Sequence, residues 1–316
     1  MTRFDPYVIS AETASAIGVQ ISRDGDFAYW DFDARRFQNK TLTFASNGVL
    51  LRQFAADPRI TALITSREAI DQIGGETNIR TDVALYLSPN PRLAFFALHS
   101  FLATGLLASP GSKSVYGTGC HISSSAEIDD MGVVLGNGVV IESGCRIYRG
   151  VKIGDGCRIG SGCVIGGEGF QYLRIGKHGT QAVPHIGTVE IDDDVTLHAR
   201  VCVDRGIFLD ATRIGRGSRI DTQVHVGHAV RIGRDCLIAS GAVLCGGVFL
   251  QDCVWVGPNA TISDSLTLGS DALVSIGSVV IQNVPEGTRV SGNFAAPHHL
   301  FMKAFCQTYV PQARAK

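Results

Sequence analysis

The sequence predicts a mainly β fold: a left-handed parallel β-helix of hexapeptide repeats, with a small α/β domain before it and a short C-terminal helix after it. Two periodic patterns predict the β-helix. Large aliphatic residues recur at every sixth position, and a small or β-branched residue usually stands four places after each. The aliphatic series comprises Leu135, Ile141, Ile147, Ile153, Ile159 and Ile165, and later Ile214, Ile220, Val226, Ile232, Ile238, Leu244, Leu250, Val256, Ile262, Leu268, Val274 and Val280.

A period of six suits a short flat strand followed by a sharp turn, and three such units make one triangular coil. The aliphatic residues would then stack down the interior, while polar residues and many of the 37 glycines would supply the turn conformations. An α-helix would need apolar spacings of three and four, and the Gly and β-branched content disfavours it.

Four of the nine cysteines stand at the small-residue positions of this repeat: Cys145, Cys157, Cys163 and Cys236. A buried free Cys behaves as a small hydrophobic residue. Because the chain also lacks any CxxC pair, we expect buried free thiols rather than disulfides or zinc ligands.

Two segments interrupt the repeat. The period is lost from Gly166 to His185, in GGEGFQYLRIGKHGTQAVPH, and one turn is out of step from Asp204 to Arg213, in DRGIFLDATR. Departures from a solenoid repeat form loops on one face, which is often the binding face. We therefore expect the longer segment to project beside a functional site.

Residues 1–108 show no sixfold repeat and alternate strand-like with helix-like segments, which predicts an α/β domain. VALYLS (83–88) is expected to form a strand, and Asn90-Pro91 is expected to cap a helix that ends before Gly105. The predicted domains are residues 1–108, the β-helix at 109–290 and a helical tail at 291–316. No glycine-rich phosphate loop of a standard type is present in the first domain.

The overall charge is nearly balanced, with 28 basic and 29 acidic side chains. No basic field is therefore expected to attract nucleic acid or an anionic membrane. The start of the chain lacks a signal-peptide pattern, and no apolar run approaches the ~20 residues of a membrane span. We expect a soluble cytoplasmic protein with no integral membrane segment.

The stretch IDTQVHVGHAVRIG contains His225 and His228, three residues apart. Two places after Val226, His228 should point outward, whereas His225 should lie near a corner. A flat face packed against another subunit could desolvate such a histidine, which would then act as a base near neutral pH. A metal site is the alternative, as in the three-histidine zinc sites of γ-class carbonic anhydrases. It would need His198 as a third ligand, and we expect no metal.

Several ordered motifs resemble one family, the UDP-3-O-acylglucosamine N-acyltransferases of lipid A synthesis (LpxD), over roughly residues 40 to 300. The matching pieces are Leu42-Thr43-Phe44 with Asn47, SPNPRLAF, Gly169-Phe170 with Tyr172, Pro184 with Ile186-Gly187, Val203-Asp204-Arg205-Gly206, and Asp221, Gln223 and Val226-Gly227-His228 with Val230-Arg231-Ile232-Gly233. The ordered series GFxY, DRG and D-x-Q-x₄-H is the specific part.

The resemblance implies a homotrimer with active sites in the clefts between neighbouring β-helices. His228 would be the general base, taking a proton from the sugar 2-amine as the amine attacks the thioester of a 3-hydroxyacyl chain on acyl carrier protein. Asp221 would support or orient this histidine. The implied substrate-binding residues are Phe44, Asn47, Gly169, Phe170, Tyr172, Gln223 and His225. The acyl thioester, carried by acyl carrier protein or coenzyme A, is a co-substrate, so the resemblance implies no cofactor.

The chain departs from the family pattern at three places. Leu50 stands where the family has a Tyr that pairs with the residue matched by Phe44 around uracil, and a second family histidine is replaced near Ser265. The family's carboxy-terminal helices are represented by one short helix at most. Two alternatives therefore stay open: a coenzyme A-dependent acyl- or acetyltransferase acting on another amino sugar nucleotide, and a non-catalytic β-helix that binds a sugar nucleotide or serves as a scaffold.

Overall fold

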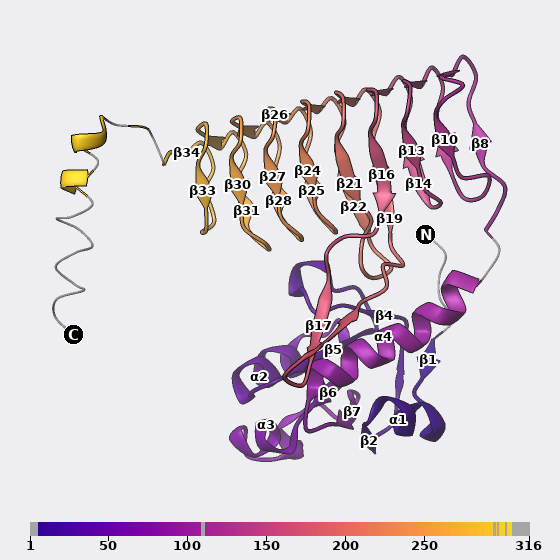
Figure 1. Ribbon diagram of the computed structural model, residues 1–316. Coiled ribbons are helices and arrows are strands. Elements are labelled where there is room, and N and C mark those ends of the chain that lie inside the picture. The colour runs from indigo at the N-terminus through magenta and orange to yellow at the C-terminus, as the bar shows by residue number, and fades with distance from the viewer. Residues whose placement is uncertain (1–5, 109–110, 293–294, 296, 301, 305–316) are drawn as a thin grey trace.

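A computed structural model describes the chain except for residues 1–5, 109–110, 293–294, 296, 301 and 305–316 (Figure 1). Its larger part is a three-sided prism of stacked coils, and all neighbouring strands on each side are parallel. The structure thus confirms the predicted fold class, a left-handed parallel β-helix joined to a small α/β unit. The helix expected in the tail falls in a segment that lies largely outside the described residues.

Three parallel sheets form the sides of the prism. The first contains β10 (Glu127–Ile128), β13 (Arg146–Ile147), β16 (Val164–Gly167), β21 (Cys202–Asp204), β24 (His225–Val226), β27 (Val243–Leu244), β30 (Thr261–Ile262) and β33 (Val279–Val280). The second contains β8 (Val115–Tyr116), β11 (Val134–Leu135), β14 (Val151–Ile153), β19 (Thr188–Ile191), β22 (Ala211–Ile214), β25 (Arg231–Ile232), β28 (Phe249–Leu250) and β31 (Thr267–Leu268). The third contains β9 (His121–Ile122), β12 (Val140–Ile141), β15 (Arg158–Ile159), β20 (Thr196–Leu197), β23 (Arg219–Ile220), β26 (Leu237–Ile238), β29 (Trp255–Val256), β32 (Leu273–Val274) and β34 (Arg289–Val290).

The interior of the prism consists of the aliphatic residues that the repeat singled out. Val226, for example, pairs with Val203 in the coil before and Leu244 in the coil after, and all three are buried. Each such side chain contributes about 1.5–3 kcal/mol by leaving water. The predicted placement of the cysteines is also confirmed, because Cys145, Cys157, Cys163 and Cys236 are buried free thiols.

The amino-terminal part contains a five-stranded sheet in the order β2 (Gln20–Arg23), β7 (Ala84–Leu87), β6 (Ile60–Thr65), β5 (Thr41–Ala45) and β4 (Tyr29–Trp30), with a separate pair of β1 (Tyr7–Val8) and β3 (Asp26–Phe27). Its helices are α1 (Ala11–Ile17), α2 (Gly48–Ala56), α3 (Arg67–Gln72) and α4 (Pro91–Ala108), with short 3₁₀ turns η1 (Ala34–Arg36) and η2 (Glu76–Asn78). Asn90 caps α4 as predicted, with its Oδ1 accepting from the Leu93 N–H at 3.1 Å. The helix nevertheless runs through Gly105 to Ala108, because one glycine in an apolar helix costs only ~1 kcal/mol.

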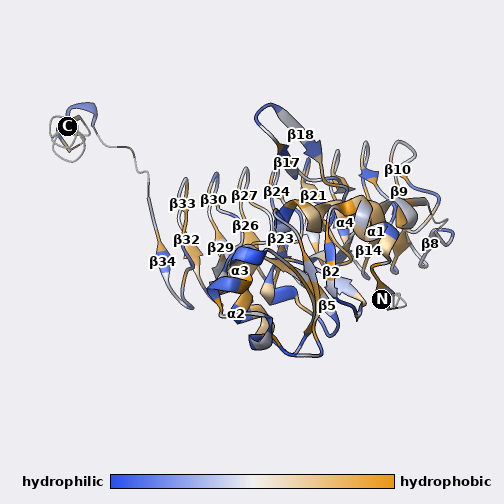
Figure 2. Ribbon diagram, turned by 90° about the horizontal axis from the view of Figure 1, so that it is seen from below, coloured by the Kyte–Doolittle hydropathy of each residue, from blue (hydrophilic) through white to orange (hydrophobic). Residues whose placement is uncertain are grey.

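The longer interruption forms the antiparallel hairpin β17 (Tyr172–Ile175) and β18 (Gly179–Ala182), which projects from the row of coils in both views (Figures 1 and 2). The shorter interruption, after β21, forms a loop. Both pack against the amino-terminal sheet and α4: Leu173, Val183, Ile207 and Phe208 share one buried cluster with Phe95 and Phe96. The prediction of a projecting loop is confirmed, and the interruptions also join the two parts of the molecule.

A buried histidine strengthens this junction. The Trp30 Nε1–H donates to His99 Nδ1 at 3.0 Å, so Nε2 carries the proton and donates to the Pro184 carbonyl at 2.7 Å. Burial lowers the pKa of His99 to about 4, which keeps the ring neutral. The end of the long loop, next to His185, is therefore fixed to α4.

Among the residues that the structure describes, no helix is long and apolar enough to cross a membrane.

Candidate active site

His228 lies at the turn that follows β24, and its ring rests on the turn of the next coil. A Cβ at Gly246 would come within 2.3 Å of His228 Cε1 and 2.5 Å of Nε2, so only glycine leaves room for this ring position. The side chain is half-buried, and its Nδ1 is buried without a hydrogen-bond partner among the described residues. His228 is thus more enclosed than the surface position that the repeat predicted.

The surroundings of His228 keep its imidazole neutral. Desolvation lowers the pKa to about 4, with His185, Arg36 and His225 acting in the same direction and Asp264 opposing them. A neutral imidazole has an unprotonated nitrogen at physiological pH and can accept a proton. His228 is therefore unprotonated, which is the state that a general base requires.

A second histidine lies beside the first. The His185 and His228 rings pack edge to face with centroids 5.7 Å apart. His185 is only 1% exposed, and its Nδ1 lies 3.0 Å from the Val183 carbonyl oxygen. Burial lowers the pKa of His185 as well, so two neutral imidazoles adjoin each other.

Gly169 marks the point where the long loop meets the prism. A Cβ there would lie 2.9 Å from Asp204 Oδ2, 3.2 Å from His185 Nε2 and 3.2 Å from His228 Cδ2. Three side chains from separate segments therefore converge beside one glycine, which a larger residue would push apart. This places the predicted residue Gly169 directly at the His228 corner.

The carboxyl of Asp204 ends β21, and it contacts His225 of the neighbouring strand β24. His225 Nε2 lies 3.5 Å from Asp204 Oδ2. Burial raises the pKa of Asp204 to about 6, and the charge of His225 works against that rise. His225 belongs to the strand, paired with Cys202 and Val243, so the prediction of a corner position was wrong. The residue directly before the aliphatic position lies within the strand.

Asp221 and Gln223 lie away from this cluster. Both precede β24, whereas His228 follows it, so they stand at the opposite edge of the same side. Asp221 Oδ1 accepts from the Thr222 N–H at 2.7 Å, and no contact between Asp221 and His228 is present in the described part of the chain. Gln223 is exposed and occupies a left-handed turn with φ 61°. Within one chain, Asp221 does not orient His228.

The remaining predicted residues lie in the amino-terminal part and on the hairpin. Phe44 is half-buried and packs on Phe95 with centroids 5.2 Å apart. Asn47 caps α2, because its Oδ1 accepts from the Leu50 N–H at 2.9 Å. Phe170 is 88% exposed and lies over Tyr172, with ring centroids 5.0 Å apart. Among the described residues, no hydrogen bond, ion pair or ring contact joins these side chains to His228.

Ser265 occupies the same prism edge as His228. The Gly247 N–H donates to the His228 carbonyl at 2.8 Å, and the Ser265 N–H donates to the Gly246 carbonyl at 2.9 Å. The turns of three successive coils are thereby stacked. Ser265, where the resemblance implies a replaced histidine, therefore lies on the same edge as the candidate base and is exposed.

Comparison with known proteins supports a relationship that the motifs indicated. The bacterial transferase hexapeptide family, in six repeats, matches residues 132–167 and 211–246. A UDP-3-O-acylglucosamine N-acyltransferase of Caulobacter sp. (strain K31) is 40% identical over 122 residues, which are 39% of this chain and 36% of that protein. One of Methylorubrum extorquens (strain PA1) is 37% identical over 132 residues, 42% of this chain and 37% of that protein.

The matching segment of the chain is thus similar to part of the UDP-3-O-acylglucosamine N-acyltransferases. The aligned part spans little more than a third of the length of these curated relatives. Among solved structures, a UDP-N-acetylglucosamine acyltransferase from Campylobacter jejuni is similar at 23% identity, covering 64% of this chain and 73% of that one, with a TM-score of 0.45. The Arabidopsis enzyme of that name is 20% identical, covers 64% and 76%, and has a TM-score of 0.48.

Two members of the His228 cluster were not predicted as site residues: His185 and Asp204. Asp204 belongs to the DRG motif and was noted only as part of the resemblance. The signal for His185 was its place at the end of the repeat interruption, directly after Pro184. Nothing in the periodicity showed that the chain returns there to His228, because that return depends on the contacts of the loop with α4.

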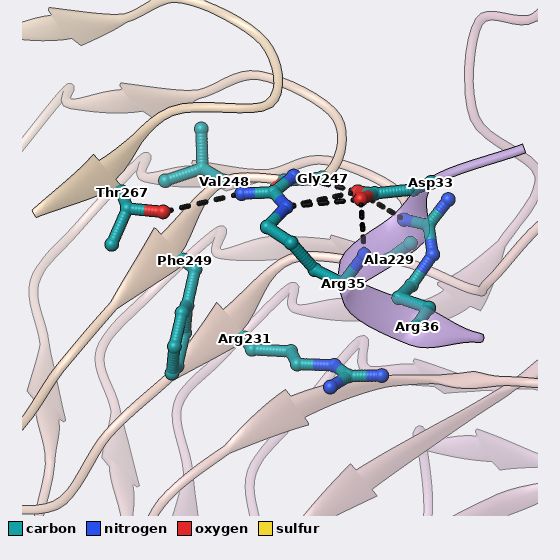
Figure 3. Close-up of a pocket in the computed structure, with 9 residues that line it drawn as sticks. All are labelled: Asp33, Arg35, Arg36, Ala229, Arg231, Gly247, Val248, Phe249 and Thr267. Atoms are coloured by element: carbon teal, nitrogen blue, oxygen red, sulfur yellow. Dashed lines mark hydrogen bonds and ion pairs between the residues drawn. The ribbon is translucent and has the colours of Figure 1, made fainter. Parts of the chain in front are cut away.

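A cavity of about 280 Å³ opens beside the same corner, between η1 and the second side of the prism (Figure 3). Its lining residues are Asp33, Arg35, Arg36, Ala229, Arg231, Gly247, Val248, Phe249 and Thr267. Arg35 crosses from η1 to the prism, where its Nη2 donates to the Gly247 carbonyl at 2.9 Å. The cavity therefore combines guanidinium groups with an apolar wall and adjoins the turn that carries His228.

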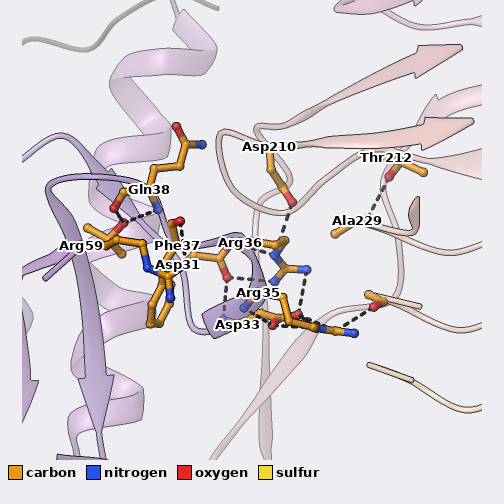
Figure 4. Close-up of polar contacts among 12 residues, drawn as sticks. Asp31, Asp33, Arg35, Arg36, Phe37, Gln38, Arg59, Asp210, Thr212 and Ala229 are labelled. Carbon is orange, nitrogen blue, oxygen red and sulfur yellow. Dashed lines mark hydrogen bonds and ion pairs between the residues drawn. The ribbon is translucent and has the colours of Figure 1, made fainter. Parts of the chain in front are cut away.

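One of those arginines is at the centre of a buried ionic network (Figure 4). Arg36 Nε and Nη2 donate to the two oxygens of Asp31 at 2.8 and 2.9 Å, and Asp210 Oδ2 lies 3.5 Å from Arg36 Nε. Burial raises the pKa of Asp210 to about 6, although Arg36 opposes that rise. The network fixes η1, and with it the cavity wall, to the loop after β21.

In the described ranges, no group of three or more His, Cys, Asp or Glu side chains is arranged to hold a metal ion.

Proposed function

We propose that the protein is an N-acyltransferase of the lipid A type. It would transfer a 3-hydroxyacyl group from an acyl-carrier-protein thioester to the 2-amine of UDP-3-O-acylglucosamine or a similar sugar nucleotide. The observation that carries this proposal is the neutral, half-buried His228 at a corner next to a cavity. The names of the relatives that match this chain support the substrate class.

His228 is proposed as the general base. The amine nitrogen attacks the thioester carbonyl carbon and forms a C–N bond, while an unprotonated ring nitrogen of His228 takes a proton from that nitrogen. The tetrahedral intermediate then collapses, the C–S bond breaks, and the protonated imidazole returns the proton to the departing thiolate. The lowered pKa of His228 makes the imidazolium a strong acid for this last step.

The division of labour between the parts of the chain is also a proposal. Residues 1–108 would bind the uridine part of the sugar nucleotide with Phe44, and residues 109–290 would carry the chemistry. Phe170 and Tyr172 form an exposed aromatic pair just after Gly169, and this pair would contact the bound sugar nucleotide. Asp221 and Gln223 lie at the opposite edge of β24 from His228. They would therefore contribute to the active site of a neighbouring subunit and not to that of their own chain.

A homotrimer is proposed because the family resemblance implies one, and exposed apolar side chains on the outer surface of the prism support association between copies. Leu237 and Trp255 are adjacent in register on the third side and are 43% and 41% exposed. Such apolar strips favour association. The free thiols fit a reducing compartment, and we propose the cytoplasm.

The test is acyl transfer by wild type and His228→Ala. Wild type is incubated with UDP-3-O-acylglucosamine and, separately, 3-hydroxyacyl-acyl-carrier-protein and 3-hydroxyacyl-coenzyme A, and product and free thiol are measured. We expect turnover with the carrier protein and a loss of ~10²-fold or more in His228→Ala. Turnover with the coenzyme A thioester but not with the carrier-protein thioester would make acyl-coenzyme A the donor. If neither donor releases thiol with any of a panel of amino sugar nucleotides, a binding protein without activity would be favoured.

A further inference from the structure

One ring nitrogen of His185 is hydrogen-bonded, and the other has no hydrogen-bond partner among the described residues. Its Nδ1 lies 3.0 Å from the Val183 carbonyl oxygen, and a carbonyl only accepts, so Nδ1 carries the proton. Nε2 therefore presents a lone pair. It is buried, and no donor among the described residues reaches it, although the side chain as a whole is 1% exposed.

The free nitrogen faces the His228 corner. His185 Nε2 and Asp204 Oδ2 both approach the same point beside Gly169, within 3.2 and 2.9 Å, and His228 Cδ2 approaches it as closely as His185 does. The two polar atoms are acceptors when Asp204 is ionised. The neighbouring side-chain donors are directed elsewhere. His225 Nε2 lies 3.5 Å from Asp204 Oδ2, and Arg205, whose charge acts on His185, donates from Nε and Nη2 to the Gly166 and Arg149 carbonyl oxygens.

A buried acceptor without a donor destabilises the free protein, and such groups are rare in folded chains. A ligand that brings an N–H to this position recovers the lost hydrogen bond. Metal ions are a poor explanation, because no group of three or more potential ligands is arranged for one in the described part of the chain. A nitrogen donor of a bound substrate fits both the acceptors and the adjoining base.

We propose that His185 is a substrate-contacting residue whose Nε2 accepts a hydrogen bond from the 2-amine of the acceptor sugar and holds the amine nitrogen beside His228. This inference rests on the proposed function, since it assumes an amine nucleophile. The hydrogen bond would select an amine at this carbon and leave the other N–H for His228. His185 would thus contribute to acceptor specificity, while His228 remains the base.

Two replacements of His185 separate the hydrogen bond from the shape of the ring. In His185→Phe the ring stays but the acceptor is lost. In His185→Gln the side-chain oxygen can accept and does not titrate. We expect the phenylalanine variant to lose about 10- to 100-fold in kcat/KM for the amino sugar, with the KM for the acyl donor unchanged, and the glutamine variant to recover most of that loss.

A binding measurement tests the inference without turnover. The affinities of UDP-3-O-acylglucosamine and of its 2-deoxy analogue, which has no donor at that carbon, are compared by calorimetry. Wild type and His185→Gln should prefer the amine by about tenfold or more, and His185→Phe should bind the two nucleotides equally. Thermal unfolding is recorded for each variant, and His185→Leu replaces the phenylalanine variant if that variant does not fold.

The two proposals fail in different ways. If wild type transfers acyl groups and His228→Ala does not, but His185→Phe matches wild type in kcat/KM and keeps its amine preference, the role of His185 is overturned and the function stands. If wild type transfers nothing, the function is overturned, and the calorimetric preference still decides whether His185 receives an amine. Equal loss of affinity for the amine and the 2-deoxy analogue would indicate a structural role and also overturn the inference.

Discussion

The imidazole of His228 occupies the space that a side chain at Gly246 would fill. A Cβ at Gly246 would approach His228 Cε1 to 2.3 Å, closer than non-bonded carbons come. The candidate base is thus positioned by the absence of a side chain in the next coil. The ring position of His228 in one turn therefore depends on which residue stands at position 246 in the turn stacked on it.

Gly246→Ala should therefore displace His228 without unfolding the prism. The new methyl group meets the movable end of the ring, so we expect acyl transfer to fall by about 10²-fold or more while the free energy of unfolding changes by less than about 2 kcal/mol. Steady-state kinetics and urea unfolding measure the two effects. Gly105→Ala is the matched control, because a Cβ there has no heavy atom within 4 Å. Full activity in Gly246→Ala would contradict the position of His228.

Arg36→Met should destabilise the protein strongly. It leaves Asp31 and Asp210 largely buried without their shared cation, and breaking a buried ion pair from one side costs about 3–5 kcal/mol. Urea unfolding gives the value. The comparison is Arg67→Ala, which removes an exposed pair with Glu76 and should cost at most ~1 kcal/mol. Similar small losses in both variants would show that the network does not hold the two parts together.

The contribution of His99 to stability should depend on pH. Its folded-state pKa is about 4, below the ordinary 6.5, so the unfolded chain takes up a proton at this residue before the folded chain does. Its stabilising effect is therefore complete above pH 6.5 and declines as the pH falls towards 4, by up to about 3 kcal/mol. The difference in unfolding free energy between wild type and His99→Gln, measured from pH 7.5 to 4.5, should shrink accordingly. A constant difference would mean that His99 titrates normally.

Phe170→Ala should affect substrate use and leave stability unchanged. The ring is 88% exposed and contacts Tyr172, so its loss should change the free energy of unfolding by no more than ~0.5 kcal/mol. We expect the KM for the sugar nucleotide to rise by about tenfold through loss of the aromatic surface. An unchanged KM with a lowered thermal midpoint would assign Phe170 to folding instead.

Asn47 can be tested for its two possible roles. As the cap of α2, its replacement by Ala should cost about 1 kcal/mol, whereas Ser restores the cap. If Asn47 also binds substrate through its amide, Asn47→Ser should fold like wild type and still show a raised KM for the sugar nucleotide. Wild-type kinetics in Asn47→Ser would limit this residue to capping.

The periodic part of the molecule was predictable because each coil repeats the same strands and turns, with apolar side chains buried at the same positions. Val226 and Leu244 are buried at the positions that the spacing indicated, and Asn90 caps α4 as expected. The sixfold spacing predicted less well where each strand ends and the corner of the prism begins. It put His225 at a corner, although the residue before the aliphatic position belongs to the strand and faces its neighbours in adjacent coils.

The candidate site was less predictable because two of its members come from the interruptions. His185 reaches His228 only because Pro184 is bound by His99 and Leu173 packs with α4, and these are long-range contacts that no repeat encodes. Asp221 was paired with His228 by resemblance alone, and β24 separates them within one chain. Partial burial of His228 likewise depends on the loop that covers it.

The interruptions that dock on the amino-terminal sheet lie near the middle of the coil series, and β26 to β34 extend beyond them (Figure 1). In a solenoid each coil touches only the coils on either side. The number of coils at the far end of the prism can therefore change independently of the site. Whole coils could be inserted or removed after the turn that follows β30 without moving His228, Gly246 or Ser265. The position of the candidate base is therefore fixed, whereas the number of coils that follow it can vary.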